Sequence, residues 1–385
     1  MRNLCRIILL MLLPVCSYAQ TDSMSVQQPA EDFVTASVCI ASPGDEIYTV
    51  LGHACIRLQC PTYGLDYIYS YEAEDASHNV LRFLAGKLKM AVRTVPTEQY
   101  VAQYASDGRG VKEYVLNLPI RVKQRLWQQM DNRLGYTPVP YDYMKRGCAV
   151  SVLSWLEEAI GKDTLVYAPW PEKFERSRME MGIDSVLNEW NHFYACTFVS
   201  GESNSLDIEN ARKVIVPTEL IEVLQGATAF GMPLLTGECH VLLQQTKPVS
   251  RSKFPPIYVS LIFLVIALLN LRFRSIWLRA VVLTPCLLLG AFVLYLVLFS
   301  DLPCTQWNWL IVPFCPIPFL FWKWRRLWAL PFAAVCLLWI IGMMVYPHQI
   351  VDDAHLMLAT AMAVCNVEIF INNKNIIFNQ KNYEV

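Results

Sequence analysis

Hydrophobic residues are spread unevenly along the chain, and their distribution divides it into a start, a middle and an end. A short apolar run lies near the N-terminus, a segment of mixed polarity extends to about residue 250, and long apolar runs follow residue 255. Mixed polarity is typical of a globular domain, and long apolar runs are typical of membrane-spanning helices. This pattern predicts a signal peptide (1–19), a flexible leader (20–32), an exported domain (33–250), a transmembrane domain (255–372) and a cytoplasmic tail (373–385).

The first 19 residues have the three regions of a secretory signal peptide. Arg2 and Arg6 form the basic region, residues 7–13 form the apolar core, and Ser17-Tyr-Ala19 provides small residues at a cleavage site. The apolar core is too short to cross a bilayer, which favours cleavage over a retained anchor. Lipid attachment at Cys16 is a weaker alternative, because the Pro-Val pair before it fits such a site poorly.

The middle segment predicts an α+β domain with an antiparallel sheet. Runs rich in β-branched and aromatic residues are separated by turn residues, which indicates strands, and a run between Pro119 and Gly135 indicates a helix. The expected strands cover residues 33–40, 46–50, 54–58, 66–72, 90–95 and 112–118. The expected helices cover 119–134, 148–160 and 217–225, with a less regular helical stretch at 172–190.

The last part contains five apolar runs, which predict an all-α membrane domain of about five transmembrane helices. They occupy residues 256–271, 277–300, 307–322, 328–346 and 354–371, and the third is interrupted by proline. Arginine and lysine follow the first, third and fifth runs, whereas the other two loops carry aspartate. Because positive residues stay on the cytoplasmic side, we expect a multi-pass protein of the bacterial inner membrane with its N-terminal domain in the periplasm.

Composition argues against some classes of function. The net charge of −1 provides no basic surface, so we expect no nucleic-acid partner. The 13 cysteines contain no CxxC pair and no spacing typical of zinc sites, so we expect no metal and no cofactor. With Cys148 free, five other exported cysteines remain, and at least one of these must stay unpaired or pair outside the chain.

Cys148 stands at the start of a predicted helix and is the candidate nucleophile. Apolar residues recur at helical spacing from residue 150 to residue 160, and Gly161 ends the run. A thiol at a helix N-terminus experiences the positive end of the helix dipole, which favours the thiolate. His53 lies about 95 residues earlier on a predicted strand and is the candidate base. A disulfide or buried thiol, and an ordinary core histidine, are the alternative interpretations.

A third group is needed to orient the imidazole, and the next predicted strand offers Ser70. Strand alternation places Arg57 on the same side as His53, opposite Ala54 and Ile56. The guanidinium of Arg57 suits a phosphate or carboxylate, and a structural ion pair is an equally good interpretation.

Several short motifs follow one another in a distinctive order. Gly52-His53-Ala-Cys-Ile-Arg57 precedes a tyrosine-rich strand, then Gly86-Lys-Leu88, then Tyr141-Asp-Tyr143 ahead of Cys148. Over roughly residues 33–170 this order resembles the Lnb-type lipoprotein N-acyltransferases of Bacteroides-like bacteria. That family pattern has asparagine before the cysteine and Asn-Tyr-Gly in the second strand, where this chain has Gly147 and Ser70-Tyr71-Glu72.

The resemblance implies a permuted papain-like (NlpC-like) fold and a membrane-bound acyltransferase without a cofactor. The reaction moves a fatty acyl chain from a phospholipid donor to the N-terminal amine of a diacylated lipoprotein, both of which reside in membrane lipid. Cys148 would carry the acyl chain as a thioester, His53 would act as general acid and base, and Ser70 would be the third catalytic residue. The candidate substrate-binding residues are Arg57, Tyr71, Tyr141 and Tyr143.

Other functions remain open at this point. A membrane-tethered NlpC-like cysteine peptidase or amidase acting on cell-wall peptides would use the same pair, although one anchor would suffice for it. A non-enzymatic envelope assembly protein would function normally with Cys148→Ala. A transporter is disfavoured, because the apolar runs carry almost no ionisable residues besides His355 and Glu368.

Overall fold

The structure, a computed structural model, describes most of the chain after residue 33. It covers residues 34–381 except 47, 75–78, 142–145, 163, 169–181, 199–215 and 346–348. All of these belong to one of two compact units into which the chain divides, Val34–Val385. The predicted signal peptide and leader, and the candidate residue Tyr143, lie outside the described residues.

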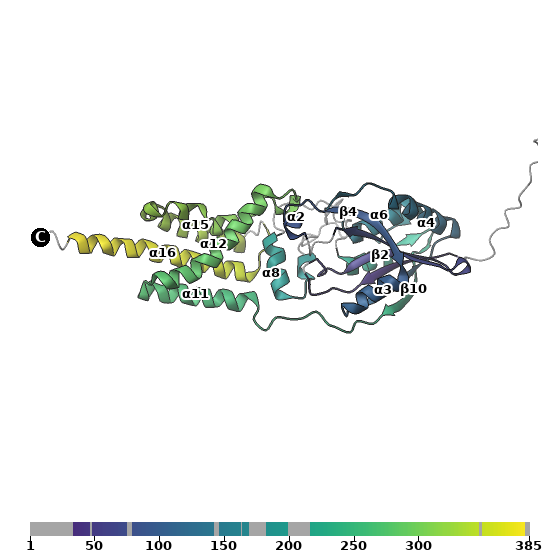
Figure 1. The fold of residues 1–385 in the computed structure, drawn as a ribbon, viewed down its shortest axis with the longest axis horizontal. Coiled ribbons are helices and arrows are strands. Elements are labelled where there is room, and N and C mark those ends of the chain that lie inside the picture. The colour runs from purple at the N-terminus through teal and green to yellow at the C-terminus, as the bar shows by residue number, and fades with distance from the viewer. Residues whose placement is uncertain are drawn as a thin grey trace, which may run out of the picture. The chain divides into compact units, whose positions relative to one another are not determined.

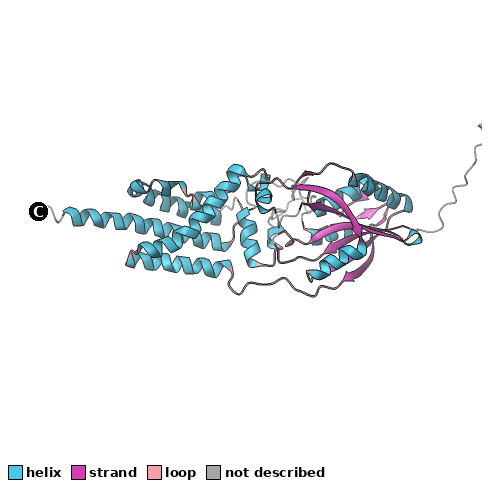
Figure 2. Ribbon diagram, viewed as in Figure 1, coloured by secondary structure: helices cyan, strands magenta, loops and turns pink. Residues whose placement is uncertain are grey.

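The described part of the exported segment is built on one large antiparallel sheet (Figure 2). Its strands are β1 (Thr35–Ala41), β2 (His53–Cys60), β3 (Leu65–Ala73), β4 (Lys89–Pro96), β5 (Val111–Leu116), β6 (Val139–Pro140) and β10 (Leu235–Leu243), in the order β10-β5-β1-β2-β3-β4-β6. A small second sheet joins β7 (Leu165–Val166), β8 (Thr228–Ala229) and β9 (Met232–Pro233). Each neighbouring pair is antiparallel, which confirms the predicted sheet type.

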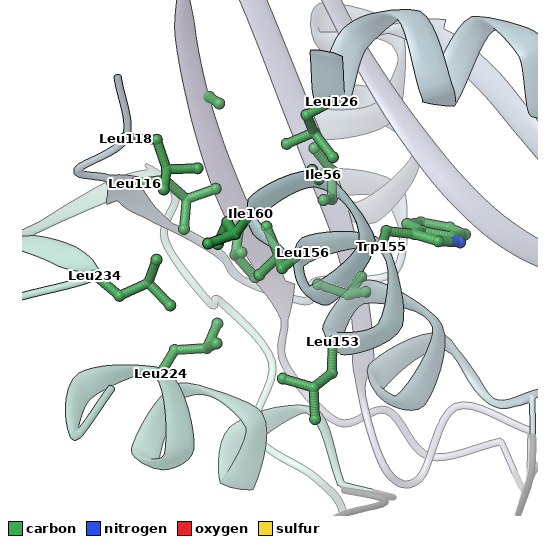
Figure 3. Packing of buried hydrophobic residues seen from close by; sticks show 14 of the residues in the cluster. Ile56, Leu116, Leu118, Leu126, Leu153, Trp155, Leu156, Ile160, Leu224 and Leu234 are labelled. Atoms are coloured by element: carbon green, nitrogen blue, oxygen red, sulfur yellow. The ribbon is translucent and has the colours of Figure 1, made fainter. Parts of the chain in front are cut away.

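Helices pack on both faces of the large sheet. The helices of this segment are α2 (Val80–Leu84), α3 (Thr97–Ser106), α4 (Ile120–Leu134), α6 (Cys148–Ile160), α8 (Glu189–Phe198) and α10 (Pro217–Gln225), and of these α4, α6 and α10 share a core with one face of the sheet while α3 packs on the other. Alternation along β2 sends Ala54 and Ile56 into a core shared with α4, α6 and α10, while Cys55 faces the tyrosines of α3. Figure 3 shows Ile56 beside Leu156 of α6 and Leu126 of α4 in the larger core.

Two local predictions for this part are wrong. The described residues of the predicted strand 46–50, namely 46 and 48–50, form a bend and turns, because backbone groups bond within the loop: the Thr49 amide donates to the Glu46 carbonyl at 2.7 Å, and the Gly44 amide donates to the Thr49 carbonyl at 3.1 Å. The sequence analysis also assigned no element to residues 97–106, which form α3 with Tyr100 and Tyr104 on its buried face.

Among the described residues, four helices are long and apolar enough to cross a membrane, not five. They comprise α11 (Pro256–Phe273), α12 (Ile276–Phe299), α15 (Arg325–Val345) and the first part of α16 (Asp353–Lys381). The third apolar run instead forms two short helices, α13 (Ile311–Phe314) and α14 (Ile317–Leu320). Pro313, Pro316 and Pro318 remove backbone donors and prevent one continuous helix there.

The interrupted segment packs closely against α12. A Cβ atom at Gly290 would stand only 1.7 Å from the carbonyl oxygen of Phe314, so α12 needs glycine where this backbone approaches. Phe314 itself is fully buried among the helices. Irregular backbone at membrane depth is tolerated where protein surrounds it, as it does at Pro313 and Phe314 of α13.

Candidate active site

The candidate base, His53, is the first residue of β2 and follows a tight turn. Gly52 has a φ of 81°, and a Cβ atom there would stand 2.6 Å from the Ala41 carbonyl oxygen, so the turn requires glycine. The imidazole is partly buried, and its Nε2 atom lies 2.6 Å from the Oγ atom of Ser70, which is 1% exposed. Among the described residues this is the only hydrogen bond of the His53 ring, so Nδ1 accepts and donates none there.

The candidate nucleophile, Cys148, is the first residue of α6, with Gly147 as the N-cap. Its thiol lies within hydrogen-bonding reach of the backbone amides of Ala54, Ala149 and Cys148 itself, and all three lower its pKa. Ala54 directly follows His53. The fold therefore brings the N-terminus of α6 to the start of β2, as the predicted pair requires.

The strands β2 and β3 separate at this point. Their pairing starts at Cys55 opposite Ser70, whereas β3 continues to Ala73 paired only with β4. Ala54 consequently has a partner in β1 but none in β3. This divergence of the two strands leaves the Ala54 amide available to the Cys148 thiol.

Both members of the pair are uncharged at neutral pH. Burial raises the pKa of the Cys148 thiol above its usual value and outweighs the backbone amides, so the expected thiolate is not favoured. Burial, and to a smaller extent the positive charge of Arg109, lowers the pKa of His53 to about 4. A neutral imidazole beside a neutral thiol suits activation by proton transfer to the base rather than a preformed ion pair.

Part of the exported domain matches a known protein family. Residues 25–171 match the family described as the Lnb N-terminal periplasmic domain. This match supports the resemblance to the Lnb-type family over that part of the chain, which we call the Lnb domain. The matched residues include His53, Ser70 and Cys148 and end before α8 and the apolar helices. No curated protein and no solved structure matches the chain. The domain match and the apolar helices together make this a membrane protein with a periplasmic domain.

The Lnb domain also holds Arg109, a site residue that the sequence analysis missed. Its side chain is buried, its Nε donates to the Ser42 carbonyl at 2.7 Å, and its guanidinium lies 4.5 Å from the centre of the Tyr104 ring. It thereby holds the loop that leads to His53 and places a positive charge near the imidazole. The one available signal was an arginine between Gly108 and Gly110.

Arg57 faces the same side of the sheet as predicted, and its guanidinium is occupied within the Lnb domain. It forms a bidentate pair with Asp66, at 2.8 and 2.7 Å, and contacts Glu113 at 3.0 Å. The Glu113 side chain is 5% exposed and the Arg57 side chain 12%. This geometry favours the structural ion pair over a substrate contact.

The tyrosines proposed to bind substrate lie at different places. Tyr71 is partly buried and meets Trp155 of α6 edge to face, with ring centres 6.1 Å apart; burial raises its pKa. The ring centre of Tyr141 lies 6.1 Å from that of Phe83 of α2, and Tyr141 packs with residues of the membrane domain such as Leu302. Tyr71 is therefore close to the start of α6, while Tyr141 belongs to the contact between the Lnb domain and the apolar helices.

Helix α8 lies between the sheet and the apolar helices (Figure 1). The loop before His53 contacts α8, where the Asn191 side chain donates to the Asp45 carbonyl at 2.6 Å. On its other side α8 contacts the membrane domain: the Thr197 carbonyl accepts from Asn308 at 2.8 Å, and the Thr197 hydroxyl lies 2.8 Å from Nε2 of His355.

The described residues contain no cluster of three or more His, Cys, Asp or Glu side chains that could hold a metal ion. The described cysteines are all free thiols. Among the exported ones, Cys39 and Cys55 stand directly opposite each other on β1 and β2. The described side chains at the candidate site are the thiol of Cys148, the imidazole of His53 and the hydroxyl of Ser70, and backbone amides lie next to the thiol.

Proposed function

We propose that this protein is a membrane-bound acyltransferase that moves a fatty acyl chain from a phospholipid to the N-terminal amine of diacylglyceryl-cysteine lipoproteins. The observation that carries the proposal is the junction of α6 with β2, where the Cys148 thiol reaches the amide next to His53 and Ser70 holds the other side of that imidazole. Its position in an Lnb-type periplasmic domain ahead of apolar helices supports it.

The first half-reaction forms a thioester. His53 takes the proton of the Cys148 thiol, the sulfur attacks the ester carbonyl of the phospholipid, and a C–S bond replaces the C–O bond. The same imidazole then returns the proton to the departing lysophospholipid oxygen. We assign the stabilisation of the negative carbonyl oxygen to the backbone amides at the start of α6, since donors at a helix N-terminus favour negative charge.

The second half-reaction transfers the acyl chain to nitrogen. The free α-amine of the lipoprotein attacks the thioester, His53 accepts a proton from the amine, and the thiol of Cys148 is restored with that proton. The lowered pKa of His53 keeps the imidazole unprotonated between the half-reactions, when it must act as a base. Because the lysophospholipid leaves before the acyl chain is transferred to the lipoprotein, the proposed reaction predicts ping-pong kinetics.

The membrane domain makes this reaction physically reasonable. Moving a roughly 16-carbon acyl chain into water costs about 0.8 kcal/mol per CH₂ group, on the order of 12 kcal/mol in total. An enzyme whose site adjoins the outer face of the membrane avoids this cost, because donor and acceptor already reside there. A peptidase acting on cell-wall peptides has no comparable need for several apolar helices.

We infer a multi-pass protein of the bacterial inner membrane with the Lnb domain in the periplasm. At the helix ends nearest α8 the only flanking cations are Arg251 and Lys253 before α11, whereas Arg272, Arg274, Arg279, Lys323, Arg325 and Arg326 lie at the opposite ends. With the interrupted third run, the four long apolar helices would make an odd number of membrane crossings, so the two ends of the membrane domain would lie on opposite sides. The order of a strand histidine followed by a helix-start cysteine also fits the proposed permuted papain-like fold.

The test is acylation of a lipoprotein in a bacterium that lacks its own N-acylating enzyme. We expect wild type to add one acyl chain, seen as a mass increase of the N-terminal lipopeptide, and Cys148→Ala to add none. Cys60→Ala is the matched control, because Cys60 is a buried thiol on β2 away from the site.

Each other result points to a different function. Acylation by Cys148→Ala would place the nucleophile elsewhere. Absence of acylation by wild type, with the protein present in the membrane, would reject the proposal. In that case release of cell-wall peptide fragments that depends on Cys148 would favour a cysteine peptidase or amidase, and a normal Cys148→Ala strain would favour an envelope assembly protein.

A further inference from the structure

The short helix α2 lies beside the candidate site. It occupies the connection between β3, which carries Ser70 and Tyr71, and β4. Because β2 and β3 are antiparallel, this connection leaves the sheet at the end where β2 begins with His53. The backbone hydrogen bond from Glu74 to the Lys89 carbonyl, at 2.9 Å, closes the base of the connection.

The C-terminal end of α2 is fixed to the membrane domain. The Asp301 amide donates to the Ala85 carbonyl at 3.0 Å, and Asp301 follows the end of α12 by two residues. Gly86 has a φ of 69°, and a Cβ atom there would stand 2.8 Å from the Leu302 nitrogen. The contact is therefore close and backbone to backbone, and it sets α2 at the level where α12 leaves the apolar layer.

Some side chains of α2 pack against the protein and others are exposed. Phe83 stacks on Phe198 of α8, with ring centres 5.3 Å apart. Val80 and Leu81 point away and are 52% and 76% exposed. Exposed apolar side chains at this level, next to a helix of the membrane domain, are those expected to contact lipid.

Charge next to these apolar side chains suits a phospholipid surface. Lys87 and Lys89 are exposed just after α2, and Arg82 is about half exposed and pairs with Glu74 at 3.0 Å. Long cationic side chains place their stems along apolar surface and their charges at the level of lipid phosphates.

We propose that α2 is the donor-loading element: Val80 and Leu81 insert into the outer leaflet and bring a phospholipid acyl ester toward Cys148, with Lys87 and Lys89 at its phosphate. The loading role rests on the proposed acyltransferase function, whereas the lipid contact does not. A second copy of the chain is a poorer occupant, because two exposed side chains fall far short of the roughly 1,200 Å² that a stable interface buries.

The direct test is photo-crosslinking of the full-length protein in vesicles of phosphatidylethanolamine and phosphatidylglycerol. A benzophenone amino acid replaces Leu81 in one variant and Tyr63 in another. Tyr63 is 72% exposed but lies in the turn after β2, roughly 25 Å along the strand from His53. We expect a phospholipid adduct at position 81 and none at position 63. No lipid adduct at 81, an adduct to a second chain, or equal adducts at both positions would overturn the proposal.

A kinetic comparison separates this inference from the proposed function. Leu81→Asp should raise the KM for the vesicle donor about tenfold, since it removes one inserted leucine side chain. Tyr63→Asp should leave this KM unchanged, and both variants should keep the wild-type rate of Cys148 alkylation by iodoacetamide. An unchanged KM in Leu81→Asp would reject donor loading while acyl transfer stands. Lipid capture at position 81 in a protein that transfers no acyl chain would instead reject the proposed function and leave the lipid contact.

Discussion

Replacement of Ser70 by alanine tests whether this hydroxyl orients the catalytic imidazole. Its Oγ atom lies 2.6 Å from Nε2 of His53 and is buried, so water cannot readily take its place. Ser70→Ala leaves the ring free to rotate and removes a partner that stabilises the imidazolium formed in the transition state.

The size of the effect follows from the nature of this hydrogen bond. A hydrogen bond to a group that becomes charged contributes about 1.5–3 kcal/mol. Since about 1.4 kcal/mol corresponds to a factor of ten in rate, Ser70→Ala should lower kcat/KM for thioester formation by about 10- to 150-fold. The donor KM should change little, because Ser70 contacts the base and not the lipid.

The assay is single-turnover formation of the acyl-enzyme, followed by the mass of the intact protein. Ser37→Ala is the matched control: Ser37 is on β1 of the same sheet, is also 1% exposed, and has an Oγ atom without a hydrogen-bond partner among the described residues. Its removal should leave the rate within about twofold of wild type. A Ser70→Ala rate within the same range, or an equal loss in Ser37→Ala, would refute the orienting role.

Three further predictions concern pH, stability and helix packing. Because the pKa of His53 is lowered to about 4, acyl-enzyme formation should persist as the pH falls below 6 and decline only near pH 4. Arg109→Gln removes a nearby positive charge and should therefore move this decline to higher pH. A wild-type decline centred near pH 6.5 would contradict the lowered pKa. Arg57→Gln leaves two carboxylates without their partner and should destabilise the protein by about 3–5 kcal/mol in thermal unfolding with the donor KM unchanged; a raised KM in a stable protein would restore its substrate role. Gly290→Ala should lower the unfolding temperature because its Cβ meets a carbonyl oxygen, whereas Gly342→Ala in α15, with open space around it, should not; equal effects would argue against the close packing.

Much of the local structure was predictable because it depends on neighbours along the chain. The helix that starts at Cys148 and ends before Gly161 follows from helical spacing and a terminal glycine, and the structure agrees with it. The division of β2 into two faces follows from strand alternation, and Ala54 and Cys55 do enter different cores. In each case the decisive information lies within a few residues of the element.

The errors arose where hydrogen bonds within a loop, or proline within an apolar run, override the preference that side-chain composition indicates. Residues 46–50 have strand-forming side chains, but the loop bonds to itself and finds no neighbouring strand. The third apolar run has the composition of a span, yet its prolines break the helix and its backbone is accommodated at Gly290. Amino-acid composition alone does not show whether a neighbouring helix leaves space for an irregular backbone.

The sequence by itself determined the division into exported and apolar parts, the antiparallel sheet, the Cys148 helix and the candidacy of His53, because apolar periodicity and turn residues encode these features locally. Only the tertiary structure decided that α6 meets β2 where β3 diverges, that Ser70 rather than a neighbour bonds His53, and that Arg57 is held by Asp66 and Glu113. These outcomes depend on strand register and on burial, which arise from contacts among residues far apart in the chain.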